Sequence, residues 1–145
     1  MKKLVLMVLM AFSLIACESQ EKKEINFSSL PQKSQQFINQ HFADKTIQII
    51  FMEKEIFDKD YEVIFVDGSK IEFNKNGNWK DVECKFRPGV PLTFIKQGIV
   101  SLVSSRFPYA FIESISFEHN RYEVDLSNDI EMVFDSEGRF LRYDD

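Results

Sequence analysis

The sequence predicts an α+β protein with two tandem units, each a helix followed by three strands, and an antiparallel sheet with both helices on one face. Three observations lead to this prediction. Proline precedes an amphipathic stretch twice, in Leu30-Pro31 and Val90-Pro91, as at many helix starts. Runs of alternating apolar residues follow each stretch. Finally, IEFNKNGNW at 71–79 recurs as MVFDSEGRF at 132–140, which indicates an internal repeat.

The chain is long enough for one domain with a substantial core. It has 145 residues, of which 44% are hydrophobic and 14% aromatic, so a disordered chain is excluded. The domain is assigned to residues 30–145, with repeats at 30–84 and 90–145. A formal net charge of −5 disfavours a polyanionic partner such as nucleic acid or an anionic membrane surface.

The N-terminus predicts export. Two lysines precede residues 4–16, in which only Ser13 is polar; this run is too short to span a bilayer and is typical of a signal peptide at 1–16. Leu14-Ile15-Ala16-Cys17 resembles the lipobox of bacterial lipoproteins, which implies lipidation of Cys17. The polar segment 17–29 is then expected to be a tether. An Asp directly after the lipobox Cys would resemble the inner-membrane retention signal of enteric bacteria, but this chain has Glu18 there. The resemblance therefore implies an outer-membrane lipoprotein facing either the periplasm or the cell surface.

Each predicted helix has one apolar face. These faces follow the helical period of 3.6 residues. The first comprises Ser34, Phe37, Ile38, His41 and Phe42, and the second comprises Ile95, Ile99, Leu102, Val103 and Arg106.

The strands are predicted from period-two alternation. First strands are expected at 46–55 and 111–118, and Tyr61-Glu62-Val63 and Tyr122-Glu123-Val124 begin the second strand of each unit. Asp67-Gly68 predicts a tight hairpin, and Asn74–Gly77 a longer one with Gly in the left-handed position. The residues expected to hold the core are Tyr61, Phe65, Tyr122 and Phe134.

No candidate catalytic or metal site in the sequence has the partner residues, at the required spacing, that such a site needs. The Asn74–Gly77 segment lacks the alternating oxygen ligands and terminal acid of a calcium loop. His41 and His119 are the only histidines, too few at this spacing for a metal site. Cys84 has no evident base for a nucleophilic role. No cofactor, metal or catalytic residue is therefore expected.

A difference between the repeats suggests a contact surface. Ile64 and Val66 occupy positions that Asp125 and Ser127 occupy in the second repeat. The apolar residues mark either a partner contact or burial beneath another part of the chain. Trp79 is either a core residue or a contact residue. The candidate contact residues are Ile64, Val66, Trp79, Glu123 and Asp125, the acids steering a basic partner.

The paired motifs resemble the PepSY-like, beta-lactamase-inhibitor-like family of exported Bacteroidetes proteins. The resemblance rests on Tyr61-Glu62-Val63, residues 71–79 and their second copies. It implies a non-enzymatic, lipid-anchored binding module of the envelope, a protein or peptidase inhibitor being one form. The partner would be an envelope protein or peptide, and the membrane would be contacted through the lipid anchor only. The alternatives are a structural or assembly accessory lipoprotein, or a small hydrolase.

Overall fold

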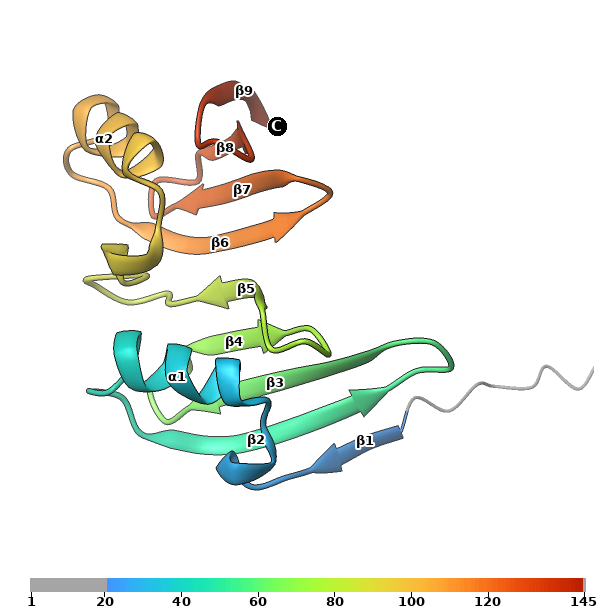
Figure 1. Cartoon of the computed structure of the whole chain (residues 1–145). Helices are drawn as coiled ribbons and strands as arrows, with labels where there is room; N and C mark the ends of the chain where they lie inside the picture. The colour runs from blue at the N-terminus through green and yellow to red at the C-terminus, as the bar shows by residue number, and fades with distance from the viewer. Residues whose placement is uncertain (1–20, 145) are drawn as a thin grey trace, which may run out of the picture.

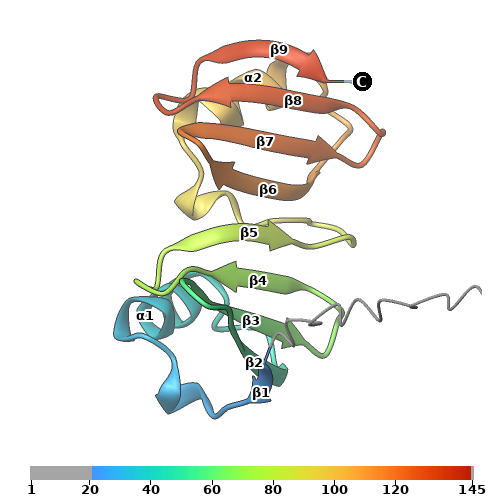
Figure 2. The ribbon, with the colours of Figure 1, turned by 90° about the vertical axis from the view of Figure 1, so that its right-hand side faces the viewer.

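The computed structural model describes residues 21–144. In this part of the chain nine strands form one antiparallel sheet. The strands follow one another in chain order from β1 to β9, as Figures 1 and 2 show. Their bounds are β1 Glu21–Glu24, β2 Ile47–Lys54, β3 Lys59–Phe65, β4 Lys70–Phe73, β5 Trp79–Glu83, β6 Ile112–Glu118, β7 Arg121–Leu126, β8 Glu131–Asp135 and β9 Phe140–Asp144. The helices are α1 Gln32–His41 and α2 Gln97–Arg106, with short 3₁₀ turns η1 at Phe27–Ser29 and η2 at Leu92–Phe94.

The expected arrangement of two helix-plus-three-strand units with both helices on one face is wrong. The described chain is mostly a nine-stranded sheet with only two α-helices, and four strands follow each helix. Of the strands that follow the helices, β5 and β9 are missing from the prediction. A bulge opposite Phe73 and another at Phe134 interrupt the pairing where these strands begin, and their alternation in the sequence is correspondingly weak.

The segment expected to be a tether is partly structured. From Glu21 to Glu24 it forms β1, which pairs with the second half of β2, from Phe51 to Lys54. All four β1 side chains are exposed, so no hydrophobic pattern marks this strand. Cys17 and the predicted signal peptide lie outside the described residues.

One row of buried side chains runs across six strands and forms the centre of the core. Neighbours in this row are paired in register, and none has any exposed surface. Because paired side chains share one face of a sheet, this row defines what we call the core face, and the other side is the open face. The row consists of Val63, Ile71, Val82, Ile115, Val124 and Met132.

The predicted helix faces and turns account for much of the packing. The buried residues of α1 are Ser34 and Ile38, and those of α2 are Ile99 and Val103. The helix α1 begins directly after Pro31, whereas η2 intervenes between Pro91 and α2. No helix within residues 21–144 is long and apolar enough to cross a membrane.

The recurring turn contacts the beginning of the preceding helix in both halves of the molecule, the first comprising α1 with β1 to β5 and the second comprising α2 with β6 to β9. A Cβ atom on Gly77 would lie 2.8 Å from Cβ of Pro31, and one on Gly138 would lie 3.1 Å from Cβ of Lys96. Both glycines have φ of +82°, which side-chain-bearing residues rarely adopt. The constant glycine therefore serves both the turn geometry and its close contact with a helix.

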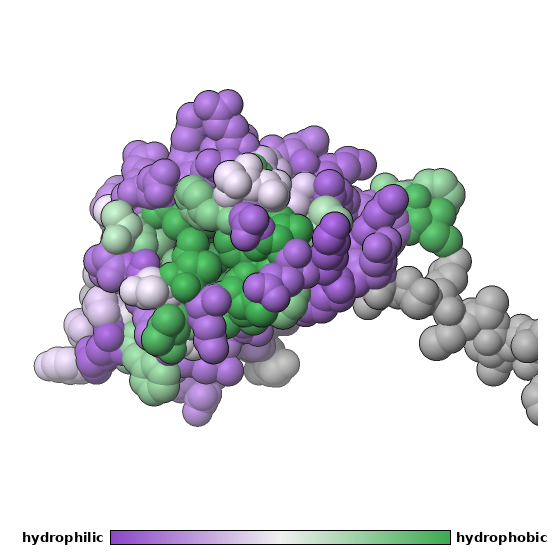
Figure 3. Space-filling model, turned by 90° about the horizontal axis from the view of Figure 1, so that it is seen from below, coloured by the Kyte–Doolittle hydropathy of each residue, from purple (hydrophilic) through white to green (hydrophobic). Residues whose placement is uncertain are grey.

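The β1–β2 edge of the sheet exposes part of the core. Seen from below, this side shows a hydrophobic area framed by hydrophilic residues (Figure 3). Half-buried apolar side chains pack against the core here, including Ile25 after β1, Phe27 in η1 and Ile47 in β2. The pairing of β1 stops at Phe51, with one further bond from the Ile25 amide to the Ile50 carbonyl. Among the described residues, no strand lies on the outer side of the first residues of β2.

Candidate functional site: an aromatic cleft

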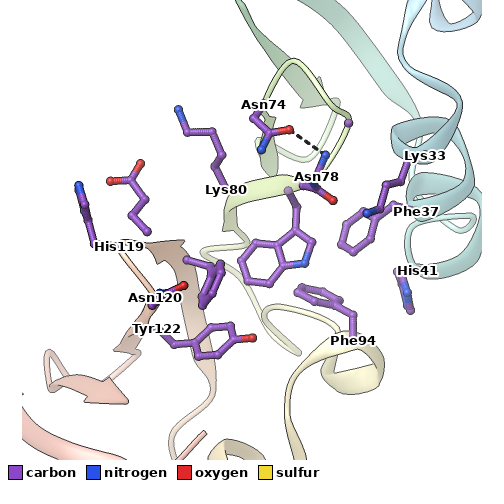
Figure 4. Close-up of a pocket in the computed structure, with 14 residues that line it drawn as sticks. Lys33, Phe37, His41, Asn74, Asn78, Lys80, Phe94, His119, Asn120 and Tyr122 are labelled. Carbon is purple, nitrogen blue, oxygen red and sulfur yellow. Dashed lines mark hydrogen bonds between the residues drawn. The ribbon is translucent and has the colours of Figure 1, made fainter. Parts of the chain in front are cut away.

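A cleft of about 690 Å³ lies between the two halves of the molecule. Four elements line it: α1, the β4–β5 turn, η2 and the β6–β7 hairpin (Figure 4). Five aromatic rings form its apolar part, and polar groups surround them. We call it the aromatic cleft, and its rings are Phe37, Trp79, Phe94, Phe117 and Tyr122.

The rings contact one another across the boundary between the halves. Trp79 lies 5.3 Å from Phe94, 6.5 Å from Phe117 and 6.2 Å from Tyr122, measured between ring centroids. Phe94 in turn lies 4.9 Å from Phe37 at an angle of 67°. Tilted and edge-on contacts of this kind are favourable for aromatic rings. The half-buried Trp79 thus connects the first half to the β6–β7 hairpin.

Hydrogen bonds fix the conformation of the β4–β5 turn, which forms one wall of the cleft. The Asn74 side-chain oxygen accepts bonds from the amides of Asn76 and Asn78, at 3.0 and 3.1 Å. The buried Ser34 hydroxyl donates to the Gly77 carbonyl at 3.1 Å. Asn74 therefore acts as an Asx turn former, and α1 holds the turn against the cleft wall.

Polar and charged residues lie around the aromatic floor. Lys33 is exposed at the start of α1, and Lys80 pairs with Asp60 at 2.7 Å. His119 and Asn120 occupy the β6–β7 turn with φ of 50° and 60°, the left-handed pair that a tight hairpin requires. An apolar floor with a polar border is the usual composition of a ligand or peptide site.

His41 belongs to the wall of the cleft. Its Nδ1 lies 2.7 Å from the Thr93 hydroxyl, and its ring lies 4.9 Å from Phe37 and 5.4 Å from Phe94. Burial lowers the pKa of His41, because an apolar setting disfavours the charged imidazolium. The side chain contributes a neutral, ring-shaped surface at neutral pH.

Cys84 is a buried thiol. Only 2% of its surface is exposed, and burial raises its pKa. Reactive cysteines need the opposite setting, an accessible thiol with a lowered pKa. Within residues 21–144, no group of three or more His, Cys, Asp or Glu side chains is placed to hold a metal ion.

The predicted contact residues do not form one surface. Trp79 is paired with Phe73 on the core face, whereas Ile64 alternates with the buried Val63 and Phe65 and lies on the open face. Ile64 is half-buried beside Ile49, and Val66, just after β3, is 65% exposed.

The two predicted acids also lie on the open face, in the second half of the molecule. Glu123 is exposed and Asp125 is half-buried on β7, where the Asp125 carboxylate accepts a hydrogen bond from the Ser114 hydroxyl. Three strands separate β7 from β3. The acids are therefore remote from Ile64 and lie on the other side of the sheet from Trp79.

The predicted core residues are confirmed with one exception. Tyr61 is 6% exposed, and Phe65 and Phe134 are fully buried. Tyr122 is only half-buried and lines the cleft, where burial raises the pKa of its phenol. Phe37, Phe94 and Phe117 line the cleft as well, although the sequence did not mark them as contact residues. Phe117 carried a signal, since it alternates with Ile115 at the end of β6.

Three solved structures closely resemble this fold. A protein of Bacteroides thetaiotaomicron described as a "putative calcium-regulated periplasmic protein" is 40% identical with a TM-score of 0.81, covering 86% of this chain and 97% of its own. A protein of Bacteroides vulgatus described as a "putative periplasmic protein" is 38% identical with a TM-score of 0.80, over 86% and 98% of the two chains. A second B. vulgatus protein is 30% identical with a TM-score of 0.79, over 86% and 100%.

The family comparison agrees with the resemblance seen in the sequence. A comparison with curated proteins found no match. The family profile described as "Putative beta-lactamase-inhibitor-like, PepSY-like" matches residues 59–142, more than half of the chain and most of both halves of the sheet. This chain is therefore a member of the PepSY-like, beta-lactamase-inhibitor-like family.

Proposed function

We propose that this protein is a non-enzymatic binding module of the bacterial envelope, anchored by lipid at Cys17, which captures a segment of an envelope protein in the aromatic cleft. The observation that carries the proposal is the clustering of five rings from four elements around one open cavity. Family membership and periplasmic neighbours support the binding role and the envelope location. Inhibition of a peptidase or another enzyme is one outcome of such binding.

The cleft favours an apolar or aromatic side chain of the partner. Trp and Tyr are common binding hot spots because they offer large, rigid, partly apolar contact surfaces. Asn78, Asn120 and Lys33 at the border can form hydrogen bonds with the backbone or acidic groups that flank such a side chain. The open-face residues Glu123 and Asp125 would then act at longer range, steering the approach of a basic partner.

Calcium is not part of this proposal. One neighbour is described as calcium-regulated, and acids of this chain, such as Glu72, Asp81 and Glu123, do lie on the open face. However, the described residues contain no metal-holding group of three or more candidate ligands. A small hydrolase with Cys84 as its nucleophile is likewise disfavoured, because this thiol is buried and burial raises its pKa.

Site-specific photo-crosslinking in cells tests the proposal. A photoreactive residue is placed at Asn120 on the border of the cleft, at Ile64 on the open face, or at the 89% exposed Tyr109 as a control. We expect a discrete crosslinked envelope protein from Asn120 and none from Tyr109. Crosslinking from Ile64 alone would show that the open face, and not the cleft, is the contact surface.

A further inference from the structure

The hairpin between β2 and β3 ends in two exposed apolar side chains. Phe57 is 91% exposed and Ile56 is 66% exposed. The turn itself is closed by a hydrogen bond from the Glu55 amide to the Asp58 carbonyl, 2.9 Å long. In Figure 1 this hairpin extends beyond the neighbouring turns. The tip therefore projects these apolar side chains into solvent, away from the core.

The hairpin tip lies beside the point where the chain enters the domain. Glu21, the first residue of β1, is paired with Lys54, the last residue of β2. Cys17 precedes Glu21 by four residues, which span at most about 14 Å when fully extended. A lipid on Cys17 would thus hold the bilayer within a short distance of Ile56 and Phe57.

We propose that Ile56 and Phe57 insert into the lipid bilayer as a second membrane contact beside the Cys17 anchor. This inference rests on the lipid anchor of the proposed function. A lipid on Cys17 tethers the domain at one point, and a second apolar contact with the bilayer would fix the orientation of the domain and add buried apolar surface. An Ile–Phe pair supplies the apolar surface for such a contact. Lys54 and Lys59 lie opposite each other at the base of the hairpin, and their cations can reach the lipid headgroups. They also balance the charges of Glu55 and Asp58, which flank the apolar pair.

The insertion would also orient the aromatic cleft. Successive strands are antiparallel neighbours, so the β2–β3, β4–β5 and β6–β7 connections all lie at the same end of the sheet. The last two of these connections line the cleft. A bilayer at the hairpin tip therefore places the border of the cleft toward the membrane, where it can reach a membrane-proximal segment of a partner.

Depth-dependent fluorescence quenching tests the insertion. The full-length, lipidated protein is prepared in the Trp79→Phe background, which removes the only tryptophan of the chain. A single indole is then introduced by Phe57→Trp, by Ile56→Trp, or by Tyr109→Trp as a control of nearly equal exposure, 89%. Each variant is reconstituted into phosphatidylcholine vesicles with and without brominated acyl chains.

We expect a blue-shifted emission that brominated lipids quench for Phe57→Trp and Ile56→Trp, and neither effect for Tyr109→Trp. Membrane fractionation of the same proteins separates the two proposals. If wild type sediments with membranes and Cys17→Ser does not, the anchor holds, and unquenched indoles at both tip positions would then overturn the insertion alone. If wild type and Cys17→Ser fractionate alike, the anchor itself fails. Equal quenching at Tyr109 would also overturn the insertion, because contact would not be specific to the tip.

Discussion

The indole of Trp79 lies 5.3 Å from the ring of Phe94 at an angle of 68°. This contact joins β5 to η2, the segment that leads into the second half of the chain. Because Phe94 also contacts Phe37 of α1, a single ring connects the first helix to the centre of the cleft. The aromatic cleft is therefore part of the packing between the halves as well as a surface open to a ligand.

Loss of the indole should weaken the fold as well as the cleft. We expect Trp79→Ala to lower the free energy of unfolding by about 2 kcal/mol, because a half-buried ring and its edge-on contacts are removed. Chemical denaturation measures the change. Phe57→Ala at the exposed hairpin tip is the control and should stay within about 0.5 kcal/mol of wild type; equal losses in the two variants would contradict the packing role of Trp79.

Substitutions at two turn glycines distinguish the cost of backbone strain from the cost of disturbing a contact with a helix. Gly68 and Gly77 both have positive φ, but a Cβ on Gly68 meets nothing within 4 Å, whereas one on Gly77 meets Pro31 at 2.8 Å. Gly68→Ala should therefore cost about 1 kcal/mol of unfolding free energy and Gly77→Ala about 2–3 kcal/mol. The measurement is urea unfolding of both variants. Indistinguishable midpoints would show that the contact of the turn with α1 is unimportant.

The hydrogen bond from Ser34 to Gly77 is buried and links residues far apart in the chain. Removing its donor leaves the Gly77 carbonyl without this partner, so Ser34→Ala should lower stability by about 1 kcal/mol. Ser104→Ala is a matched control, because the exposed Ser104 hydroxyl donates to a carbonyl within its own helix. Thermal unfolding compares the two. A larger loss of stability in Ser104→Ala than in Ser34→Ala would show that the buried hydrogen bond does not stabilise the fold.

Stability should fall as pH rises past the titration of Asp81. Burial, with repulsion from Glu72 and Glu83, raises the pKa of Asp81 from 3.8 to about 6. The folded chain therefore retains this proton to higher pH than the unfolded chain does. The resulting cost is absent below about pH 4, grows between about pH 4 and 6, and is fully present above it.

Replacing Asp81 removes this cost. At neutral pH it amounts to about 1–2 kcal/mol, after allowance for the solvent that screens this partly exposed carboxyl. Asp81→Asn should raise the free energy of unfolding by that amount at pH 7.5 and have little effect at pH 4. Urea unfolding at the two pH values tests this, with the exposed Asp44→Asn as control. A stabilisation equal at both pH values would argue against titration of Asp81.

Sequence patterns identified the elements whose residues pack by simple periodicity. The start of α1 follows from Pro31, and the recurring turn follows from Gly77 and Gly138, since each glycine meets a geometric need. The strand β1 escaped prediction because its pairing uses backbone groups and its side chains are all exposed. The strands β5 and β9 escaped because bulges disrupt their alternation.

The cleft depends on tertiary geometry that one sequence pattern does not encode. Trp79 was identified as a contact candidate from its residue type, but its partners Phe94 and Phe117 come from segments after it in the chain. Ile64 and Trp79 were grouped together although they lie on opposite faces, because the bulge between Trp79 and Asp81 at the start of β5 was not recognised. The side on which a residue lies depends on the register of every bulge in its strand.

The most direct test of the binding role uses Trp79 as the reporter. Because it is the only tryptophan in the chain, incorporation of fluorotryptophan gives one ¹⁹F resonance from the floor of the cleft. The partner captured by crosslinking is titrated against this labelled protein and against its Ile64→Asp variant. Our account predicts a saturable shift of the resonance, with equal affinity in both proteins. An unchanged resonance at saturating partner, together with loss of binding in Ile64→Asp, would contradict it and assign the contact to the open face.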